Sequence, residues 1–583
     1  RRPEALGHAP FGIGLWVGGA NSPNRWQDAI KALSRLGRAS DESRNPFLVT
    51  ECPWCKAQMG RVRSGSSVVV LGYRRLGQKV YFACPDPRCE FSSRLPLHVV
   101  DDALYEDPPT IVIGTVDKFA QLAWSEKPRR FFGIGLDGKR FASPPNLIVQ
   151  DELHLITGPL GTMVGAFEPL VEHLCTHGLG RAAPPKVVCS TATVRNYSDQ
   201  VRWLFGRRRT AVFPPPMFSV GDSFFGVYAR TESDELAPGR LYVGINATAL
   251  RSHMAIQIRV YAAVLQAVMA LPEAERDPYW TLLGFFNTLR DLGSTVTLLR
   301  DQVQGHLYAI WRRRGLLGDA HKGERRSLYH VEELTGRLSS DEVPRALERL
   351  TVPYGDEAGA VDVCLASNMI EVGIDVDRLG LMVVTGQPKT NAQYIQVTGR
   401  VGRDWRRRPG LVFTVYSPTR ARDRSVFESF RTTHERMYAS VEPASVTPFS
   451  LPAMRRALHA SMVGFVRQLL PEDELSSPAE VDLTRLEAYR SLMRHRLELV
   501  DPSAAGDFEA LFRRRLQEWR SPGPGKWQNY VDLADEDVLL SPRSRDGRPD
   551  VGTPWATPTS MRNVDAECVV DVKVAFKAEN VGA

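Results

Sequence analysis

Short apolar runs alternate with segments of helical periodicity through most of the chain. After Thr110, the runs TIVIG, NLIVQ and KVVC are each followed by a polar loop and then by a helical pattern. A second series begins near Gly221, with apolar runs at 279–287, 361–367, 379–386 and 410–417. Such alternation predicts parallel strands with helices on both faces of the sheet. The chain is therefore expected to have an α/β fold with two parallel-sheet domains.

The segments outside these two series follow other patterns. Residues 12–19, GIGLWVGG, predict a Gly-rich loop that leads into an amphipathic helix at about 25–36. After Ser440 the pattern is mainly helical, and residues 521–563, rich in Pro, Gly, Asp and Arg, are expected to be irregular. With a Pro-rich hinge at 213–217, these boundaries predict a first domain over 1–215, a second over 216–440 and a helical or irregular C-terminal region over 441–583.

Length and composition narrow the class of protein. A chain of 583 residues predicts about three to four domains. With 43% hydrophobic and 24% charged residues and no apolar run of ~18 residues, it is expected to be soluble and without a membrane span. Because it begins at Arg1 and shows no signal-peptide pattern, we expect a fragment of a longer protein.

The basic residues permit a polyanionic partner. The net charge is +7, and arginine triplets lie at 207–209, 312–314, 406–408 and 513–515. Such triplets can grip phosphates. A solvated helix face explains any single triplet equally well, so charge alone does not identify the partner.

Four of the eight cysteines form a spaced group. Cys52 and Cys55 form one pair, Cys84 and Cys89 the other, and two predicted strands joined by a turn separate the pairs. Four thiolates suit a structural Zn²⁺, because they leave no open coordination position for water. We expect a zinc ribbon over residues 48–98, inserted in the first domain, with two disulfides or free thiols as the alternative. The scattered cysteines are typical of buried thiols, which indicates a reducing cytoplasm.

The string DELH at 151–154 follows the run NLIVQ, which predicts a buried strand. Functional side chains of parallel sheets lie just past the carboxyl ends of the strands. Asp151 is expected to hold Mg²⁺, and Glu152 to orient and deprotonate an attacking water, as phosphoryl transfer requires. His154 is expected to link the γ-phosphate side to the second domain. A simple helix cap is the alternative for the Asp-Glu pair.

The string STAT follows the next apolar run and carries the hydroxyls of Ser190, Thr191 and Thr193. These hydroxyls can hydrogen-bond the carboxylates of the DELH loop and transmit the nucleotide state to the surface between the domains. Because Ser and Thr also cap helices in many proteins, the string is weak evidence by itself.

The string QVTGRVGR carries two arginines, Arg400 and Arg403, three positions apart. This spacing predicts that both lie on one helix face and can reach phosphates across a cleft, where they would neutralise charge that develops in the transition state. Gln396 is expected to contact the γ-phosphate region. A basic surface helix is the alternative. The two glycines count against it, since Gly destabilises an exposed helix.

Other loops at strand ends carry groups that can grip a phosphate backbone without reading sequence. The candidates are Thr115 and Asp117 in GTVDKF, Asn287, Thr288 and Arg290 in FFNTLRD, and Thr335 and Gly336 in ELTGR. Each one alone is ordinary loop chemistry, so their order along the chain is what favours a shared role.

In this order, TVDKF, DELH, STAT, FFNTLRD, SNMIEVGIDVD and QVTGRVGR resemble the successive motifs of superfamily 2 DExH helicases over about residues 110–404. The resemblance implies two RecA-like domains, Mg²⁺-ATP in the cleft and a nucleic-acid strand that crosses both domains. It further implies that Ser367 touches a backbone phosphate, that Gly373 allows a close main-chain approach and that Asp375 reaches the ribose or couples ATP to strand binding.

The sequence QDELHLITGPLGTMVGAFE, the cysteine ribbon and the tail TSMRNVDAE resemble a narrower group, the DrmA helicases of DISARM, a bacterial anti-phage defence system. This resemblance implies DNA as the substrate, single-stranded or duplex with an exposed strand, and a DrmB-like protein partner. The chain departs from the family at Val397, where the last motif usually has its first arginine.

A second departure concerns the phosphate-binding loop. The Gly-Lys-Ser/Thr ending of that loop, which supplies a lysine and a metal-binding hydroxyl, occurs nowhere in the chain. We expect the loop upstream of Arg1, and expect no ATPase activity from this chain by itself.

These observations predict an ATP-dependent DNA helicase or translocase that uses ATP, Mg²⁺ and structural Zn²⁺. Two alternatives stay open. One is a non-catalytic nucleic-acid-binding scaffold of the same shape, and the other is an RNA helicase of the same superfamily, since DNA and RNA differ only by the 2′-hydroxyl and methyl groups that these motifs do not read.

Overall fold

The chain forms two compact units. The computed structural model describes residues 11–19, 21–38, 45–64, 67–176, 183–191, 195–215, 222–250, 252–316, 318, 323–338, 342–367, 375–404, 409–521, 523–528, 537–544, 552–562 and 567–568. The first unit comprises Arg1–Thr191, Asn196–Thr210 and Ala444–Ala583, and the second comprises Ala192–Arg195 and Ala211–Pro443. The predicted C-terminal region thus lies in the same compact unit as the first predicted domain.

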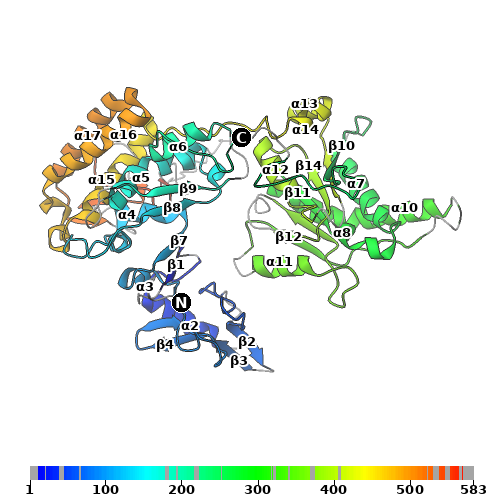
Figure 1. Ribbon diagram of the computed structural model, residues 1–583, viewed down its shortest axis with the longest axis horizontal. Helices are drawn as coiled ribbons and strands as arrows, with labels where there is room; N and C mark the ends of the chain where they lie inside the picture. The colour runs from blue at the N-terminus through cyan, green and yellow to red at the C-terminus, as the bar shows by residue number, and fades with distance from the viewer. Residues whose placement is uncertain are drawn as a thin grey trace, which may run out of the picture. The chain divides into compact units, whose positions relative to one another are not determined.

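A six-stranded parallel sheet forms the centre of the second unit (Figure 1). Its order is β10 (Arg240–Ile245), β15 (Gly410–Val415), β14 (Leu381–Thr385), β11 (Leu282–Phe286), β13 (Val363–Ala366) and β12 (Val331–Leu334). The central strands β11, β13 and β14 are buried along their whole length. Because both faces are covered, their sequences are continuous apolar runs, as the sequence predicted.

Helices cover the two faces of this sheet. Leu283 and Phe285 of β11 pack in one core with α11 (Glu342–Thr351) and α12 (Asn391–Thr398). The alternate residues Leu282 and Phe286 pack in the other core with α7 (His253–Val268), α9 (Leu289–Leu298) and α10 (Gln304–Gly315). The period of two along a strand therefore sends successive side chains into opposite layers, and the α/β prediction is confirmed for this unit.

The first unit contains two smaller parallel sheets. One has the order β6 (Leu97–His98), β1 (Ile13–Trp16) and β7 (Ile111–Gly114), and the other pairs β8 (Leu147–Gln150) with β9 (Lys186–Cys189). The loop predicted for residues 12–19 is therefore wrong at its centre, which is a strand. Gly14 allows it to pack there, because a Cβ would lie 2.2 Å from Leu104 and 2.6 Å from Pro109.

The strands of the first unit expose apolar side chains. On β8, which was predicted to be buried, Val149 is 64% exposed, and on β7 Ile113 is 54% exposed. Leu147 and Ile111 are also exposed. The prediction of a buried β8 is therefore wrong for the described residues, because none of them covers this face. The alternating apolar positions nevertheless have the composition of a strand that packs against a further layer.

The cysteine segment folds as two antiparallel hairpins, where the sequence had predicted two strands. The first joins β2 (Gly60–Ser64) to β3 (Ser67–Leu71), and the second joins β4 (Tyr73–Leu76) to β5 (Lys79–Phe82). The predicted amphipathic helix is present as α2 (Trp26–Leu36) and packs in the same small core as Phe47 and Phe82.

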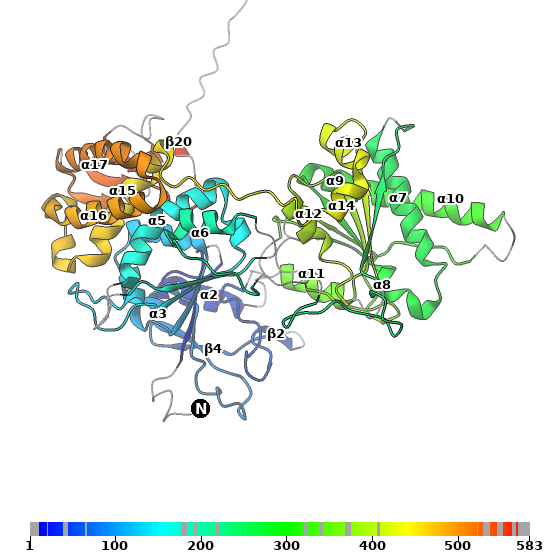
Figure 2. The same ribbon diagram turned by 45° about the horizontal axis from the view of Figure 1, so that its top comes forward.

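The C-terminal part packs on the first unit through α15 (Leu451–Leu469), which contacts α5 (Gly158–Thr176), and through α16 (Leu486–Val500) and α17 (Ala505–Arg520) (Figures 1 and 2). Buried Arg129 fastens α15, since its guanidinium donates to the carbonyl oxygens of Leu470, at 2.7 Å, and Arg467. The segment predicted to be irregular also contains a small sheet of β16 (Lys526–Gln528), β17 (Val538–Ser541) and β19 (Trp555–Ala556). Its apolar side chains join the main core of the unit.

Among the described residues, no helix combines the length and the apolar character that crossing a membrane requires.

Candidate functional site

The DELH loop lies directly past the carboxyl end of β8, as predicted. Asp151 accepts hydrogen bonds on one carboxylate oxygen from the Glu152 amide, at 2.9 Å, and from the Ser190 hydroxyl. Glu152 has a φ of +50°, in the left-handed region that non-glycine residues seldom adopt. The Leu153 amide donates to the Ser190 carbonyl at 2.9 Å, so the loop is fixed to the end of β9.

The residues after β9 hold the side chains of this loop. The ring Nδ1 of His154 lies 3.3 Å from the Thr191 hydroxyl and 3.3 Å from a carboxylate oxygen of Glu152. Ser190 therefore bonds a carboxylate of the DELH loop, as the sequence predicted for the STAT hydroxyls, whereas Thr191 bonds the His154 ring instead. Thr193 lies outside the described residues.

Gln200 holds the loop through two hydrogen bonds and was not identified from the sequence. It lies on α6 (Tyr197–Phe205), is fully buried, and donates to the carbonyl oxygens of Leu153 and Ile156 at 3.0 Å each. A glutamine on a helix carries no motif, which is why sequence reasoning passed over it. The result is a rigid loop that presents two exposed or half-buried carboxylates, the donor set that Mg²⁺ prefers.

The residues after β7 contact the C-terminal segment. Thr115 ends the strand and is exposed. The Asp117 carboxylate accepts hydrogen bonds from the Ser560 hydroxyl at 2.5 Å and from the Arg562 amide at 3.2 Å, and pairs with the Arg562 guanidinium at 3.0 Å. Arg562 is 71% exposed at its side chain. Because a carboxylate repels phosphate, we infer that Asp117 serves strand binding by positioning Arg562.

The three predicted strand-binding loops of the second unit converge at one edge of its sheet. Asn287, Thr335 and Ser367 directly follow β11, β12 and β13. These strands are parallel and adjacent, in the order β11-β13-β12. Residues 80 positions apart in the chain are thereby brought to neighbouring strand ends, as Figure 1 shows for the strands themselves.

Within these loops, some predicted residues bond the protein itself. The Asn287 amide donates to three carbonyl oxygens after β14, those of Thr385, Gly386 and Gln387, at 3.2–3.4 Å. Thr335 is buried and its hydroxyl accepts from the Arg337 amide at 3.4 Å. Ser367 is 8% exposed. These residues shape the edge rather than present a broad binding surface.

Other predicted residues face solvent. Thr288 caps α9 by accepting from the Asp291 amide at 3.1 Å, and Thr288, Arg290 and Gly336 are all exposed. Arg290 is therefore a cation at this edge that is exposed to solvent.

The two arginines of QVTGRVGR follow α12 rather than lie on it, so the prediction of a shared helix face is wrong. The helix ends at Thr398, before Arg400. Gly402 has a φ of +62°, and a Cβ there would lie 2.5 Å from the Cα of Gly410 on β15. This close backbone approach needs glycine and turns the chain away from the helix axis.

The acidic residue of SNMIEVGIDVD meets the second arginine. The Asp375 carboxylate lies 3.0 Å from the Arg403 guanidinium, and Asp375 is largely exposed. Gly373 lies outside the described residues. The pair places a carboxylate and a guanidinium from two motifs in contact within one unit.

The first half of QVTGRVGR is buried. Gln396 is 8% exposed on α12, and Val397 is fully buried in the core with Leu283 and Phe285. The departure from the family pattern at Val397 thus has a packing reason, because an arginine at this point would place a charge in an apolar core.

The four cysteines of the ribbon meet at one point. Their Sγ atoms all lie within 4.8 Å of one another, and those of Cys55 and Cys84 are 3.4 Å apart. A tetrahedron with metal–sulfur distances of about 2.3 Å has sulfur–sulfur distances of about 3.8 Å, which this cluster fits. Cys52, Cys84 and Cys89 are buried and Cys55 is exposed. The residues therefore suit a structural zinc.

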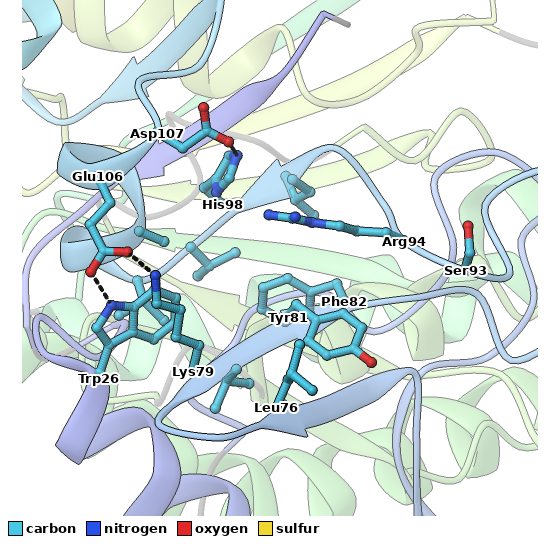
Figure 3. Close-up of a pocket in the computed structure, with 15 residues that line it drawn as sticks. Trp26, Leu76, Lys79, Tyr81, Phe82, Ser93, Arg94, His98, Glu106 and Asp107 are labelled. Carbon is cyan, nitrogen blue, oxygen red and sulfur yellow. Dashed lines mark hydrogen bonds and ion pairs between the residues drawn. The ribbon is translucent and has the colours of Figure 1, made fainter.

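A cavity of about 400 Å³ lies beside the ribbon, between β4–β5, β6 and α3 (Asp101–Glu106) (Figure 3). Its polar groups largely pair with each other. Glu106 accepts from Trp26 at 2.8 Å and from Lys79 at 2.5 Å, and His98 lies 3.7 Å from Asp107. Burial lowers the pKa of His98, so its ring is neutral at neutral pH. The cavity lies where the ribbon packs against α3, and its lining includes no residue of the motif loops.

The contact between Asp117 and Arg562 yields a testable prediction. Replacing Arg562 with alanine is expected to weaken single-strand binding and to lower the dependence of log K on log salt by about 0.7, the loss of one phosphate contact. If Asp117 acts only through Arg562, Asp117→Ala is expected to have a similar effect, and the double variant to be no weaker than Arg562→Ala. Multiplied effects in this double-mutant cycle would instead show that Asp117 binds the strand by itself.

Comparison with known proteins agrees with the motifs. A family model described as the helicase conserved C-terminal domain matches residues 305–404. Over 94% of its length the chain is 36% identical to the DISARM protein DrmA of Bacillus paralicheniformis (strain ATCC 9945a / NCIMB 11709 / CD-2), and it covers 51% of that protein. The chain thus spans about half the length of the curated relative that it matches.

Solved structures of helicases are more distant. The DUF1998 helicase MrfA bound to DNA and AMPPNP is 16% identical, with a TM-score of 0.41, over 78% of this chain and 48% of that chain. Helicase Lhr of Mycobacterium smegmatis bound to ssDNA and AMP-PNP is 18% identical, with a TM-score of 0.40, over 66% of this chain and 42% of that chain.

Proposed function

Because this chain is a helicase-like protein of superfamily 2, related to DrmA, we propose that the protein couples Mg²⁺-ATP hydrolysis to movement along DNA. The observation that carries the proposal is the rigid DELH loop, in which the carboxylates of Asp151 and Glu152 are held past a strand end by bonds to Ser190 and Thr191. A sheet edge that supplies exposed hydroxyl and guanidinium groups in the second unit supports a nucleic-acid strand as the partner.

In this proposal the first unit supplies the acid–base chemistry. Bound Mg²⁺ would neutralise the charge of the phosphates, and Asp151 is the residue that would hold it. Glu152 would accept the proton of the attacking water as the water oxygen bonds to the γ-phosphorus and the bond from that phosphorus to the β–γ bridging oxygen breaks, so that ADP leaves. His154 contacts both Glu152 and Thr191. A change in the charge of the Glu152 carboxylate would therefore alter the contact of His154 with the loop after β9.

The second unit supplies the charge that stabilises the transition state. Arg400 and Arg403 reach the phosphates, with Gln396 beside them on α12. Asp375 holds Arg403 at 3.0 Å, and a phosphate that competes for this guanidinium would release the carboxylate. We propose that this exchange couples nucleotide binding to the motif loop that begins at Ser367, directly after β13.

Each unit would contact the nucleic acid at the carboxyl ends of its own strands. Thr115 and Arg562 would contact it from the first unit, and Arg290, Thr288 and the loop at Gly336 from the second. These groups bind phosphate and sugar and carry no base specificity, so movement along any sequence follows from them.

The phosphate-binding loop is proposed to lie in the part of the protein outside this chain. The exposed apolar side chains of β7 and β8, such as Ile113 and Val149, support this assignment, since they would be covered by the rest of a RecA-like domain. The chain spans about half of the related DrmA, which leaves room for it. A DrmB-like partner and a role in anti-phage defence follow from the same relationship as proposals.

The test is ATP hydrolysis by the full-length protein with and without DNA. Stimulation by single-stranded DNA, and movement detected by displacement of a bound protein from the strand end, are the expected results. Stimulation by RNA alone would assign the protein to the RNA helicases. Strand binding without any hydrolysis would support the non-catalytic scaffold.

A further inference from the structure

Helix α10 of the second unit carries exposed aromatic and basic side chains on one surface. The surface is formed by Tyr308, Trp311, Arg312 and Arg325, and we name it the α10 surface. In Figures 1 and 2, α10 extends from the side of the unit opposite to α12, which precedes Arg400 and Arg403. We propose that the α10 surface is a second binding site for single-stranded nucleic acid, separate from the motif edge.

The aromatic part of the surface is held in place before any ligand binds. Tyr308 is 45% exposed, and its ring centroid lies 5.9 Å from that of Trp311 with the ring planes tilted by 37°. The Trp311 indole donates to the Gly323 carbonyl at 3.0 Å, which fixes its ring. Behind them Leu307 is fully buried against α7 and β11. The hydrogen bond holds the Trp311 ring, and the neighbouring Tyr308 ring is exposed, so an unstacked base can stack on it.

Cations surround this ring. The Arg325 guanidinium lies 5.9 Å from the Tyr308 ring centroid, and Arg312 is one helical turn further along α10, on the same face as Tyr308. Arg312 and Arg325 are exposed. None of the carboxylates in the described parts of the chain pairs with these two arginines, so their charge is available to a ligand.

Residues 323–329, which run alongside α10, extend the surface. Gln304 at the start of α10 donates to the Leu328 carbonyl at 3.1 Å, and the next residue, Tyr329, is 81% exposed. Together with the bond from Trp311 to Gly323, this shows that residues 323–329 run alongside the helix. The surface thus offers two exposed rings, those of Tyr308 and Tyr329, together with exposed arginines.

The pattern favours a single strand over the other polyanions. Duplex DNA hides its base faces, so it would use the arginines and leave Tyr308 idle. An acidic protein would pair with the arginines but gives no reason for an exposed, prearranged ring. A single strand uses both, because phosphates meet guanidinium groups while a base stacks on the ring.

This site extends the proposed function, because a second grip on the strand, away from the motif edge, would retain the DNA while the motif loops release it. It does not depend on ATP hydrolysis, so the two proposals can fail separately. Binding measured without nucleotide tests the α10 surface, and ATPase activity tests the motor.

The experiment measures anisotropy of a labelled deoxythymidine strand and of an abasic strand of equal length with the full-length protein. The double variant Arg312→Ala/Arg325→Ala is expected to bind both strands about tenfold more weakly and to lower the salt slope by about 1.4. Tyr308→Ala is expected to weaken binding of the deoxythymidine strand about fivefold and to leave the abasic strand unchanged. Tyr308→Phe, which keeps the ring, is expected to match the parent protein.

The matched control is Arg513→Ala/Arg520→Ala, which removes the same charge from α17, a helix whose aromatic residues Phe508, Phe512 and Trp519 are buried. It is expected to stay within twofold of the parent. Melting temperatures of all variants establish that they fold. The proposal is overturned if the α10 variants match this control, which would leave an acidic protein as the ligand, or if Tyr308→Ala weakens both strands equally.

Discussion

Replacing Glu152 with glutamine in the full-length protein is expected to lower DNA-stimulated ATP turnover by at least about 100-fold, the usual contribution of a positioned general base. Glutamine keeps the size of the side chain but cannot accept the proton of water. Binding of ATP is expected to change little, because Asp151 and the rest of the loop keep their bonds to Ser190. The measurement is the steady-state rate of phosphate release at saturating DNA, together with binding of a fluorescent ATP analogue.

The control for this prediction is Glu90→Gln, the same chemical change at an exposed glutamate of the ribbon. It is expected to leave turnover within twofold. Undiminished turnover in Glu152→Gln would refute the assigned role of Glu152. Loss of both turnover and nucleotide binding would show that the substitution disturbs the loop, in which the left-handed backbone at Glu152 and its contact with His154 are coupled.

The sequence predicted the second unit well because its signals are local and agree with one another. The run around Leu283 and Phe285 is apolar at every position, which only a strand buried on both faces requires. Each predicted loop also follows its strand directly, so the parallel topology alone brings Asn287, Thr335 and Ser367 to one edge. The family resemblance added the order of the motifs, and the similarity to DrmA agrees with the resemblance.

The errors arose where the outcome depends on contacts that are distant in sequence. The spacing of Arg400 and Arg403 fits a helix, but the approach of Gly402 to Gly410 ends the helix first. The contacts of Asp117 with Ser560 and Arg562, more than 440 residues away in the chain, were also not predicted. No periodicity or motif carries such information.

The same limit applies to burial. The apolar composition of β8 predicted a buried strand, and the composition is right for one, yet the described residues leave Val149 exposed. The apolar side chains of β8 are those of a buried strand, but the described residues do not cover them. This difference is the physical reason for placing further protein against this sheet.

Replacing Cys84 with serine is expected to remove the zinc of the ribbon and to unfold residues 48–98 locally. The four thiolates are the site's whole ligand set, since the Sγ atoms of Cys52, Cys55, Cys84 and Cys89 lie within 4.8 Å of one another. Structural zinc contributes on the order of 10 kcal/mol of apparent binding energy in zinc-finger peptides. The ribbon has only a small apolar core, in which the ring centroids of Phe47 and Tyr73 lie 5.0 Å apart. We therefore expect its two hairpins to unfold when the free energy of zinc binding is lost.

The measurement is zinc content of the purified protein, expected to fall from about one ion per chain to near zero, with limited proteolysis to locate the unfolded segment. Cys189→Ser is the matched control, because Cys189 is a half-buried free thiol on β9, outside the cluster. The control is expected to keep its zinc. The cavity beside the ribbon makes the result more informative: its walls come from both the ribbon and α3, and Lys79 joins them through Glu106 at 2.5 Å. Loss of zinc should therefore expose the β4–β5 hairpin to protease while the core around α5 and α15 stays intact, and a variant that keeps both its zinc and its resistance would exclude the cluster as a metal site.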